Sequence, residues 1–382
     1  MRRLAILGST GSIGNNALRV ISEFPGQFKV AALSANTNIE LLRRQIKRFH
    51  PSVVAVGDEA KARILKKSLS GNVRLLSGKD SSSRLLGDKS IDLVLIAISG
   101  AAALNPIIKA IELKKTIALA NKEALVMAGS LIMEKAKANG VAVIPIDSEQ
   151  SAIWQCLEGR GKDTLRKIYL TASGGPLKDS SSSYLKNVSA RQVLRHPRWQ
   201  MGRKITVDSA TLMNKGLELI EAMRLFDVPA SKIEILIHPQ AVIHSMVEFI
   251  DGVIMAQLSI TDMRIPIQYA LSYPDRLKNC LPQVDFCKLK ALTFAKPDIK
   301  KFPCLALAYR AAKSLGTMPC VLNAADEIAV EAFLSDKLRF ISIPKVIERV
   351  MDKHKNNLRP ALEDILRSDR WARKEALKII NG

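Results

Sequence analysis

The chain has 382 residues, 47% of them hydrophobic, and its 58 Lys and Arg against 36 Asp and Glu give a formal net charge of +22. A chain of this length buries a large core and is expected to form two or three domains. No apolar run reaches the roughly 18 residues that cross a membrane, which excludes a transmembrane protein. The five cysteines contain no Cys-x-x-Cys pair and the five histidines no His-Glu-x-x-His, so neither a disulfide framework, a zinc ribbon nor a zinc hydrolase is expected.

The excess of positive charge raises the question of nucleic acid. Aromatic residues make up only 5% of the chain and do not interleave with the basic clusters. A cationic surface that attracts anionic small molecules explains the charge as well, and a nucleic-acid-binding protein stays the weaker alternative. The start of the chain has no secretory signal pattern, which favours a cytosolic protein of bacterial type.

The first predicted elements are a strand over residues 3–7, a glycine turn over residues 8–14 and a helix over residues 15–22. The turn reads Gly8-Ser-Thr-Gly-Ser-Ile-Gly14, a variant of the dinucleotide fingerprint, in which glycines let the backbone approach a pyrophosphate at the helix N-terminus. Further strands are predicted, with helices between them, at residues 28–33, 53–56, 91–98, 116–120 and 141–146. This alternation predicts an α/β fold with an N-terminal Rossmann-type parallel sheet.

A polar loop containing Asn36, Thr37 and Asn38 follows the second predicted strand. An NAD-specific fold usually places Asp or Glu near this point, where it binds the ribose 2′-hydroxyl. The loop has no carboxylate, which leaves room for a 2′-phosphate and favours NADPH, with Arg43 or Arg44 as a further contact. The alternative is that the loop is merely polar.

Two later strands are followed by charged residues. Residues 121–123 read Asn-Lys-Glu and residues 147–149 read Asp-Ser-Glu, both at the carboxyl edge where open α/β sheets bind ligands. In an extended segment, residues two apart point the same way, so Asp147 and Glu149 are expected to face one point as hard oxygen ligands for Mg²⁺ or Mn²⁺. Lys122 is expected between the nucleotide and this pair, with a surface ion pair as the alternative.

The alternation stops beyond residue 150. The segment 171–176, Thr-Ala-Ser-Gly-Gly-Pro, is a small-residue loop that suits an anion, with Ser173 as a donor, although an ordinary turn is the alternative. A polar segment over residues 178–203 is predicted to form a lid that excludes water from an anionic substrate.

An amphipathic helix is predicted over residues 209–222, capped by Ser209 or the residue before it. Asn214 and Lys215 lie four and three residues before Glu218, so the three side chains share a face. An amide, an ammonium and a carboxylate on one face suit a phosphorylated ligand beside a cation. The alternative is a solvated helix with one intrahelical ion pair.

These motifs occur in the order found in the 1-deoxy-D-xylulose 5-phosphate reductoisomerases, a family that the chain resembles over essentially its whole length. The matching blocks are the glycine turn, Leu119-Ala-Asn-Lys-Glu123, Asp147-Ser-Glu149, Thr171-Ala-Ser-Gly-Gly-Pro176, Arg195-His-Pro197, Met201-Gly-Arg-Lys204, Val207-Asp-Ser-Ala-Thr211, Met213-Asn-Lys-Gly-Leu-Glu218 and Ile237-His-Pro-Gln240. Three later blocks are Asp285-Phe-Cys-Lys-Leu289, Ala291-Leu-Thr-Phe-Ala295 and Leu322-Asn-Ala-Ala325.

The resemblance implies a cytoplasmic enzyme of the non-mevalonate (MEP) isoprenoid route. Such an enzyme rearranges 1-deoxy-D-xylulose 5-phosphate and reduces the resulting aldehyde to 2-C-methyl-D-erythritol 4-phosphate, using NADPH and one divalent cation, Mg²⁺, Mn²⁺ or Co²⁺. The family is typically homodimeric through its central domain. Neither a nucleic acid nor a membrane is expected as a partner.

The resemblance also implies the site residues. The metal ligands are Asp147, Glu149 and Glu218, which with Lys122 form the catalytic set. The substrate contacts are Lys122, Ser148, Glu149, Ser173, His196, Trp199, Met201, Ser209, Asn214, Lys215 and Glu218, with Trp199 and Met201 in the lid. The cofactor contacts are Gly8, Thr10, Gly11, Ser12, Ile13, Asn36, Asn38, Asn121, Glu123 and Gly202. One departure is that relatives often carry Gly-Lys or Gly-Ser at the position of Asn36-Thr37, so a lysine that could pair with the 2′-phosphate is missing.

Together these observations predict an NADPH-binding domain over residues 1–147, a catalytic, metal-binding and dimerisation domain with a mixed sheet over 148–272, a linker over 273–298 and a helical C-terminal domain over 299–382. Another NADP-dependent dehydrogenase is the main alternative. Such an enzyme would share the first domain but would not need all three carboxylates.

Overall fold

The computed structural model describes residues 1–69, 73–194 and 202–382. Two compact units make up the chain. The first consists of Met1–Ala124, Ile132–Ser151 and Asp262–Leu281, and the second of Leu125–Leu131, Ala152–Thr261 and Pro282–Gly382. The finer division into three domains and a linker stays a prediction.

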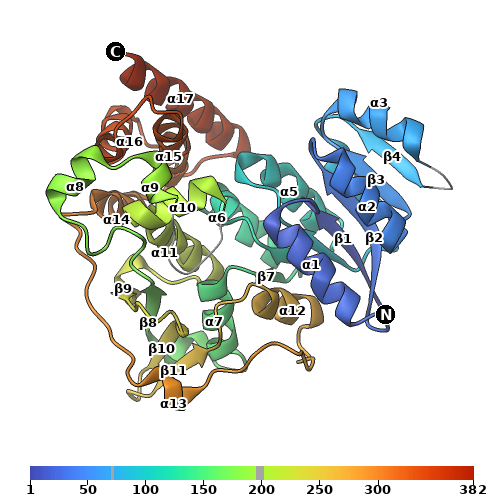
Figure 1. The fold of residues 1–382 in the computed structure, drawn as a ribbon, viewed down its shortest axis with the longest axis horizontal. Helices are drawn as coiled ribbons and strands as arrows, with labels where there is room; N and C mark the ends of the chain where they lie inside the picture. Colours follow the sequence, from blue (N-terminus) through green and yellow to red (C-terminus); the bar gives the residue numbers. More distant parts are fainter. Residues whose placement is uncertain (70–72, 195–201) are drawn as a thin grey trace. The chain divides into compact units, whose positions relative to one another are not determined.

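The first unit contains a parallel sheet of seven strands in the order β4-β3-β2-β1-β5-β6-β7. Figure 1 labels β1, β2, β3, β4 and β7 of this sheet. The strands are β1 (Arg2–Leu7), β2 (Phe28–Ala35), β3 (Val53–Val56), β4 (Arg74–Ser77), β5 (Leu93–Ile96), β6 (Thr116–Leu119) and β7 (Val143–Pro145). Every neighbouring pair is parallel, which confirms the predicted Rossmann-type fold. Strand β4 was not predicted from the sequence, because this edge strand has no fully buried side chain, whereas all four residues of β3 and of β5 are buried.

Helices connect successive strands of this sheet, as parallel pairing requires. They are α1 (Ser12–Glu23), α2 (Ile39–Phe49), α3 (Glu59–Ser68), α4 (Ser81–Leu85), η1 (Gly100–Ala103), α5 (Leu104–Glu112) and α6 (Lys122–Ala138), and α12 (Arg264–Ser272) packs against α1. Asn38, Asp58 and Asn121 cap α2, α3 and α6 by accepting a hydrogen bond from a backbone N–H of the first turn. Capping residues directly after a strand explain why these helices begin where they do.

The second unit contains a mixed sheet of four strands in the order β11-β10-β8-β9, as predicted for the central region. The strands are β8 (Leu165–Ala172), β9 (Ile233–Ile237), β10 (Ile243–Phe249) and β11 (Ile254–Leu258). The helical segments of this part are α7 (Ser148–Leu157), η2 (Lys162–Thr164), α8 (Ser182–Asn187), α9 (Ala190–Val193), α10 (Arg203–Thr211), α11 (Met213–Phe226), η3 (Ala230–Lys232) and α13 (Phe286–Leu289).

The single helix predicted over residues 209–222 was wrong, because the segment contains parts of two helices. Helix α10 ends at Thr211, α11 begins at Met213, and Leu212 between them has a left-handed backbone with φ of 61°. Asp208 and Ser209 therefore lie inside α10 and do not cap a helix. No glycine or proline marks this break, which is why the sequence pattern did not reveal it.

The C-terminal region is helical, as predicted, with α14 (Pro303–Ser314), α15 (Met318–Leu334), η4 (Phe340–Ser342), α16 (Ile343–Lys353) and α17 (Leu362–Asn381). Helix α15 packs against α14, α16 and α17, and the apolar residues of its first half are buried. It also packs against α10, while α14 packs against α11. Figure 1 shows this orange and red group of helices.

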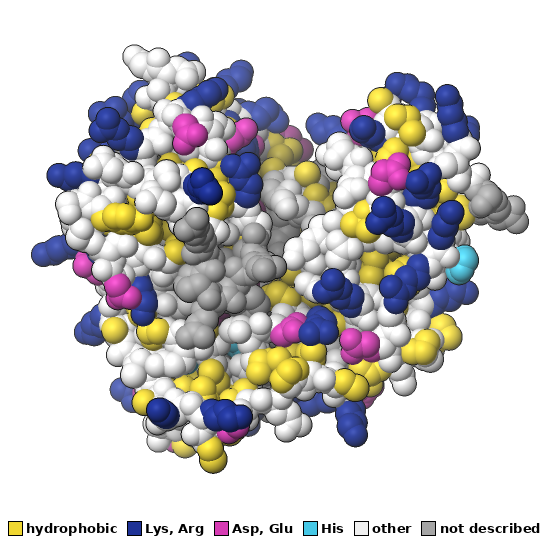
Figure 2. Space-filling view, in the orientation of Figure 1, with side chains coloured by type: hydrophobic (Ala, Val, Ile, Leu, Met, Phe, Trp, Pro, Cys, Tyr) yellow, Lys and Arg dark blue, Asp and Glu magenta, His cyan; other side chains and the backbone are white. Residues whose placement is uncertain are grey.

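The positive charge of the chain is carried at its surface. In Figure 2, Lys and Arg side chains are scattered over the visible face and outnumber the acidic ones. Arg44 and Lys47 of α2 and Lys66 and Lys67 of α3 are all exposed. Among the described residues, every helix is too short or too polar to span a bilayer.

Candidate active site

The glycine turn lies at the carboxyl end of β1, at the point where the strand order reverses between β1 and β5. Ligands of open α/β sheets bind at such switch points. Gly8 has φ of +84°, and a Cβ added to Gly14 would lie 2.4 Å from the Gly8 carbonyl oxygen, so both positions require glycine. No side chain caps α1, since its N-cap residue is Gly11. The backbone N–H groups of its first turn therefore suit a phosphate.

Three side chains, none of which was singled out from the sequence, hold the turn in place. Ser9 Oγ donates to Gln45 Oε1 at 2.7 Å, and Gln45 Nε2 donates to the Ser9 carbonyl at 2.9 Å. Asn15 Nδ2 donates to the carbonyls of Thr10 and Gly11 at 3.1 and 3.0 Å. The only sequence feature that could have pointed to one of these side chains is the position of Asn15 directly after the fingerprint. These bonds fix the turn before any ligand binds.

Asn36, Thr37 and Asn38 are exposed at the carboxyl end of β2. The Asn38 side chain caps α2, accepting from the Leu41 N–H at 3.2 Å. Asp58, in the loop after β3, also lies beside this segment, because its N–H donates to the Asn36 carbonyl at 3.2 Å. A carboxylate thus stands near the loop although the loop's own sequence has none.

Lys122 begins α6 at the carboxyl end of β6, as predicted. Its ammonium pairs with Asp147, and the two side chains are only 8% and 15% exposed, so the surface-pair alternative does not hold. Asn121, just before it, is buried and donates through Nδ2 to the carbonyls of Ile98 and Gly100 at 2.8 and 3.2 Å. Its side chain is therefore used to tie the loop after β5 to the start of α6.

The prediction that Asp147 and Glu149 belong to one extended segment was wrong. Glu149 lies in the first turn of α7, which begins at Ser148. The Ser148 hydroxyl donates to Glu149 Oε2 at 2.6 Å. An acidic residue in the first turn also interacts favourably with the helix dipole. The strand-to-helix transition, rather than strand geometry, sets the direction of Glu149.

The predicted shared face of Asn214, Lys215 and Glu218 is confirmed at the start of α11. Asn214 Nδ2 donates to Glu218 Oε1 at 2.6 Å, and the Lys215 ammonium donates to Glu218 Oε2. The Lys215 and Glu218 side chains are 4% and 1% exposed, so the pair is buried and the solvated-helix alternative does not hold. A buried pair is costly unless its geometry is well satisfied, which gives this arrangement a fixed orientation.

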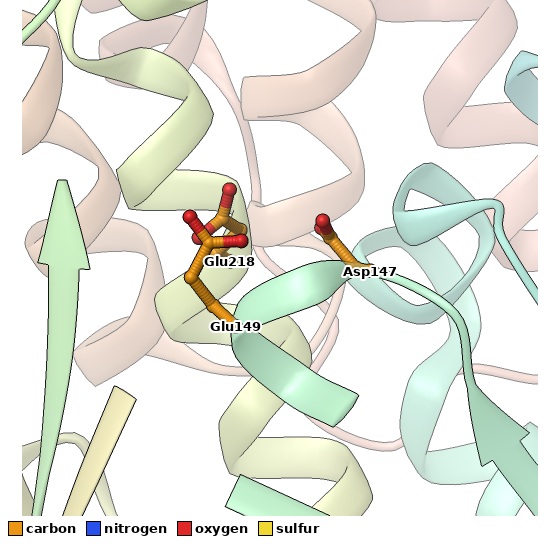
Figure 3. Close-up of side chains that lie close together, drawn as sticks. All are labelled: Asp147, Glu149 and Glu218. Atoms are coloured by element: carbon orange, nitrogen blue, oxygen red, sulfur yellow. The ribbon is translucent and has the colours of Figure 1, made fainter. Parts of the chain in front are cut away.

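The three predicted metal ligands converge. One carboxylate oxygen from each of Asp147, Glu149 and Glu218 lies within 4.8 Å of the other two (Figure 3). Three carboxylates at this separation repel one another unless positive charge or protons lie among them. Oxygen ligands in such a cluster match the preference of hard divalent cations, so these residues fit a bound Mg²⁺ or Mn²⁺.

The small-residue loop after β8 packs against α10. Gly174 and Gly175 have φ of +89° and +72°, and a Cβ on Gly175 would lie 2.4 Å from the Ser209 carbonyl oxygen. Ser173 Oγ accepts from the Gly175 N–H at 3.3 Å. The predicted substrate contacts Ser173 and Ser209 therefore come from two segments in close backbone contact.

The remaining predicted contacts divide into two groups. Gly202 is exposed at the N-cap position of α10, and Glu123 lies in the first turn of α6. His196, Trp199 and Met201 lie outside the described residues, and so does the centre of the predicted lid.

A Rossmann-type sheet with a preformed glycine turn, together with a carboxylate cluster suited to a divalent cation, defines the chain as a nucleotide-dependent, metal-assisted enzyme. Three family models match it: 1-deoxy-D-xylulose 5-phosphate reductoisomerase over residues 4–129, the C-terminal domain of that enzyme over residues 143–226, and the DXP reductoisomerase C-terminal domain over residues 258–375.

Relatives of known name match this chain over its full length. The 1-deoxy-D-xylulose 5-phosphate reductoisomerase of Thermodesulfovibrio yellowstonii is 50% identical over 380 residues, covering 100% of both chains. That of Ruminiclostridium cellulolyticum is 51% identical over 378 residues, covering 99% of each. The chain belongs to the 1-deoxy-D-xylulose 5-phosphate reductoisomerase family, as the sequence resemblance implied.

Solved structures of the same enzyme have the same fold. The Zymomonas mobilis enzyme in complex with NADPH matches with a TM-score of 0.94 and 40% identity, covering 100% of this chain and 99% of that one. A structure of the enzyme with NADPH, fosmidomycin and magnesium also gives 0.94, at 39% identity, covering 100% of this chain and 98% of that one. These matches favour the reductoisomerase over the alternative of a different NADP-dependent dehydrogenase.

Proposed function

We propose that the chain converts 1-deoxy-D-xylulose 5-phosphate to 2-C-methyl-D-erythritol 4-phosphate, with NADPH and a divalent cation. The observation that carries this proposal is the convergence of Asp147, Glu149 and Glu218. A simple carbonyl reduction by NADPH needs no such cluster, whereas a carbon-skeleton rearrangement needs charge stabilisation at two neighbouring oxygens.

Asp147, Glu149 and Glu218 are the proposed ligands of Mg²⁺, Mn²⁺ or Co²⁺. The cation held by these residues would supply Lewis-acid stabilisation of negative charge on the substrate's oxygens, and NADPH would supply the hydride. The protein's own part is to hold the ligands in place: Lys122 pairs with Asp147, and Lys215 with Glu218. Catalytic roles are proposed for the three carboxylates and for Lys122.

The substrate's carbon chain and its phosphate are proposed to contact different residues. Lys122, Ser148 and Glu149 contact the carbon chain. The phosphate-side contacts are Ser173, His196, Ser209, Asn214 and Lys215, with Trp199 and Met201 covering the substrate. Asn214 and Lys215, an amide and a cation at the start of α11, suit a phosphate because both donate hydrogen bonds and the helix dipole adds to their charge.

The proposed NADPH contacts are Gly8, Thr10, Gly11, Ser12, Ile13, Asn36, Asn38, Asn121, Glu123 and Gly202. Those of the glycine turn bind the pyrophosphate through backbone N–H groups. Asn36 and Asn38 are proposed to contact the 2′-phosphate of the ribose. The Asn121 side chain already donates to Ile98 and Gly100, so its contact is proposed through the backbone.

We further propose a cytoplasmic homodimer. All five cysteines are free, as in a reducing compartment. Strand β11 is an edge of the four-stranded sheet, and Ile250, Val253 and Ile254 around its start are 67%, 53% and 52% exposed. An apolar edge strand of this kind is usually covered by a partner. In analytical ultracentrifugation, the wild type is expected to sediment with the mass of a dimer. The variant Ile254→Lys is expected to sediment with the mass of a monomer.

The test of the activity is NADPH oxidation in the presence of 1-deoxy-D-xylulose 5-phosphate and Mg²⁺ or Mn²⁺, with and without a chelator. Metal-dependent oxidation that yields methylerythritol phosphate is expected. Folded, NADPH-binding protein that reduces simple aldehydes without metal, and leaves this substrate unchanged, would indicate a dehydrogenase instead.

A further inference from the structure

A charged cluster in the second unit contains none of the residues assigned to metal, substrate and cofactor, and its two carboxylates are buried. Lys204 Nζ on α10 donates to Asp208 Oδ2 at 2.6 Å and to Asp326 Oδ2 at 2.9 Å. Asp208 lies one turn further along α10, whereas Asp326 lies on α15 of the C-terminal helices. The residues Asp208 and Asp326 are 2% and 0% exposed. The cluster therefore joins α10 to a helix more than a hundred residues later in the chain.

The ammonium group of Lys204 pairs with two buried carboxylates, those of Asp208 and Asp326. Burial raises the pKa of the Asp326 carboxyl, and the charge of Lys204 opposes that rise. Buried ionic groups are rarely the most stable way to fill a core, and their best-attested use is to fix one arrangement of the elements that carry them. This cluster fixes the position of α10 against α15.

The segment that the cluster fixes carries the proposed phosphate contacts. Asp208 precedes Ser209, whose carbonyl packs against Gly175 in the loop that carries Ser173. The Thr211 hydroxyl donates to the Asp208 carbonyl at 3.2 Å and accepts from the Met213 N–H at 3.3 Å. These bonds span the break between α10 and α11.

The break itself needs support from its surroundings. Leu212 has φ of 61°, a left-handed conformation that leucine rarely adopts and that persists only where neighbouring groups hold it. The direction in which α11 leaves this residue decides where Asn214 and Lys215 lie. A network that holds α10 up to Thr211 therefore also determines the start of α11.

We propose that Lys204 and Asp326 are positioning residues for the phosphate pocket. They hold α10 and the left-handed residue Leu212, and through them they place Ser209, Asn214 and Lys215 for the substrate's phosphate. This inference rests on the proposed function, and it gives the C-terminal helices a part in substrate affinity although they carry none of the assigned contacts.

The test is the variant Asp326→Leu, which replaces the buried carboxylate with an apolar side chain and so removes one of the two partners of Lys204. The KM for 1-deoxy-D-xylulose 5-phosphate is expected to rise at least about tenfold, the size of one well-placed polar contact, while the Kd for NADPH is unchanged. Glu327→Gln is the matched control. Its side chain, on the next residue of α15, accepts instead from Arg373 Nη2 at 2.6 Å, so KM should stay at the wild-type value even if the melting temperature falls.

A double-mutant cycle separates positioning from a general loss of stability. In a Ser209→Ala background, Asp326→Leu should lose most of its effect on KM, because both changes act on the same contact. Additive effects, an unchanged KM in Asp326→Leu, or the same KM rise in Glu327→Gln would each overturn the inference.

Two further measurements keep the test decisive. If Asp326→Leu fails to fold, Thr211→Val removes the hydroxyl that spans the break and should give the same KM rise and the same non-additivity. Binding of inorganic phosphate, followed by ³¹P NMR, should weaken in both variants by the same factor as KM rises. Because phosphate binding needs no turnover, an inactive wild type would count against the proposed function alone, whereas equal phosphate affinity in wild type and variants would overturn the positioning role.

Discussion

The glycine turn and the carboxylate cluster are built in opposite ways. The turn consists of backbone from one short stretch, with Gly8 and Gly14 in close contact and hydrogen bonds from Asn15 to carbonyls of the same stretch, and one further side chain, Gln45 of α2, bonds to Ser9. The cluster consists of charged side chains from segments about seventy residues apart, and Glu218 within it is almost fully buried. A site made of local backbone tolerates changes of side chain but no added atoms, whereas a site made of buried charge tolerates changes of shape but no loss of a charge.

The largest expected effect comes from removing one charge from the cluster. Glu218→Gln keeps the shape and the hydrogen bond from Asn214 but takes away a ligand charge. We expect turnover to fall by at least about a thousandfold, since even indirect changes around a metal cost roughly 10–100-fold. Titration with Mn²⁺, followed by electron paramagnetic resonance, should show weaker binding, while the Kd for NADPH is unchanged.

Two comparisons make that experiment specific. Glu331→Gln removes a charge at an exposed position of α15 and should leave turnover unchanged. Removing the metal from the wild type with a chelator should abolish turnover to the same degree as Glu218→Gln. Full activity in the variant would remove Glu218 from the metal site.

The second expected effect concerns the phosphate contact. Lys215→Met keeps the apolar stem of a buried side chain and removes its ammonium group. A lost charged hydrogen bond of about 1.5–3 kcal/mol corresponds to a KM increase of roughly 10–100-fold for the phosphorylated substrate. Steady-state kinetics should show this rise, with NADPH binding unchanged. The exposed Lys345 of α16, changed in the same way, is the control, and an equal KM in both variants would contradict the role.

The third effect tests the backbone site by adding one methyl group. A Cβ at Gly14 would lie 2.4 Å from the Gly8 carbonyl oxygen, so Gly14→Ala must push the turn apart. Overpacking of this kind costs about 1–3 kcal/mol, and we expect the Kd for NADPH to rise by roughly 10–100-fold. Fluorescence titration measures it. Gly26→Ala, where a Cβ would meet nothing within 4 Å, should bind NADPH as the wild type does.

The difference between the two sites also explains what the sequence could predict. The sheet, the glycine turn and the partners of Glu218 follow from local patterns, because strand alternation and residues three or four apart on a helix depend on nearby sequence alone. The left-handed Leu212 did not follow, since no residue type marks it. The start of α7 was missed although Asp147, a preferred N-cap residue with Gln150 three residues later, marks it. The link from Asp326 to Lys204 could not be read at all, because it depends on how distant helices pack.

The smallest expected effect lies at the exposed edge of the backbone site. Asn36→Asp places a carboxylate where the ribose 2′-phosphate is proposed, next to Asp58, whose N–H already bonds to the Asn36 carbonyl. Repulsion between exposed charges is screened, so we expect the preference for NADPH over NADH, measured as the ratio of kcat/KM values, to fall only about tenfold. Asn381→Asp, an exposed change at the end of α17, is the control. The change in the NADPH-to-NADH ratio should become smaller as salt is added, because salt screens the repulsion between exposed charges. An unchanged ratio at low salt would show that this loop does not contact the phosphate, and that selectivity for NADPH depends on other residues.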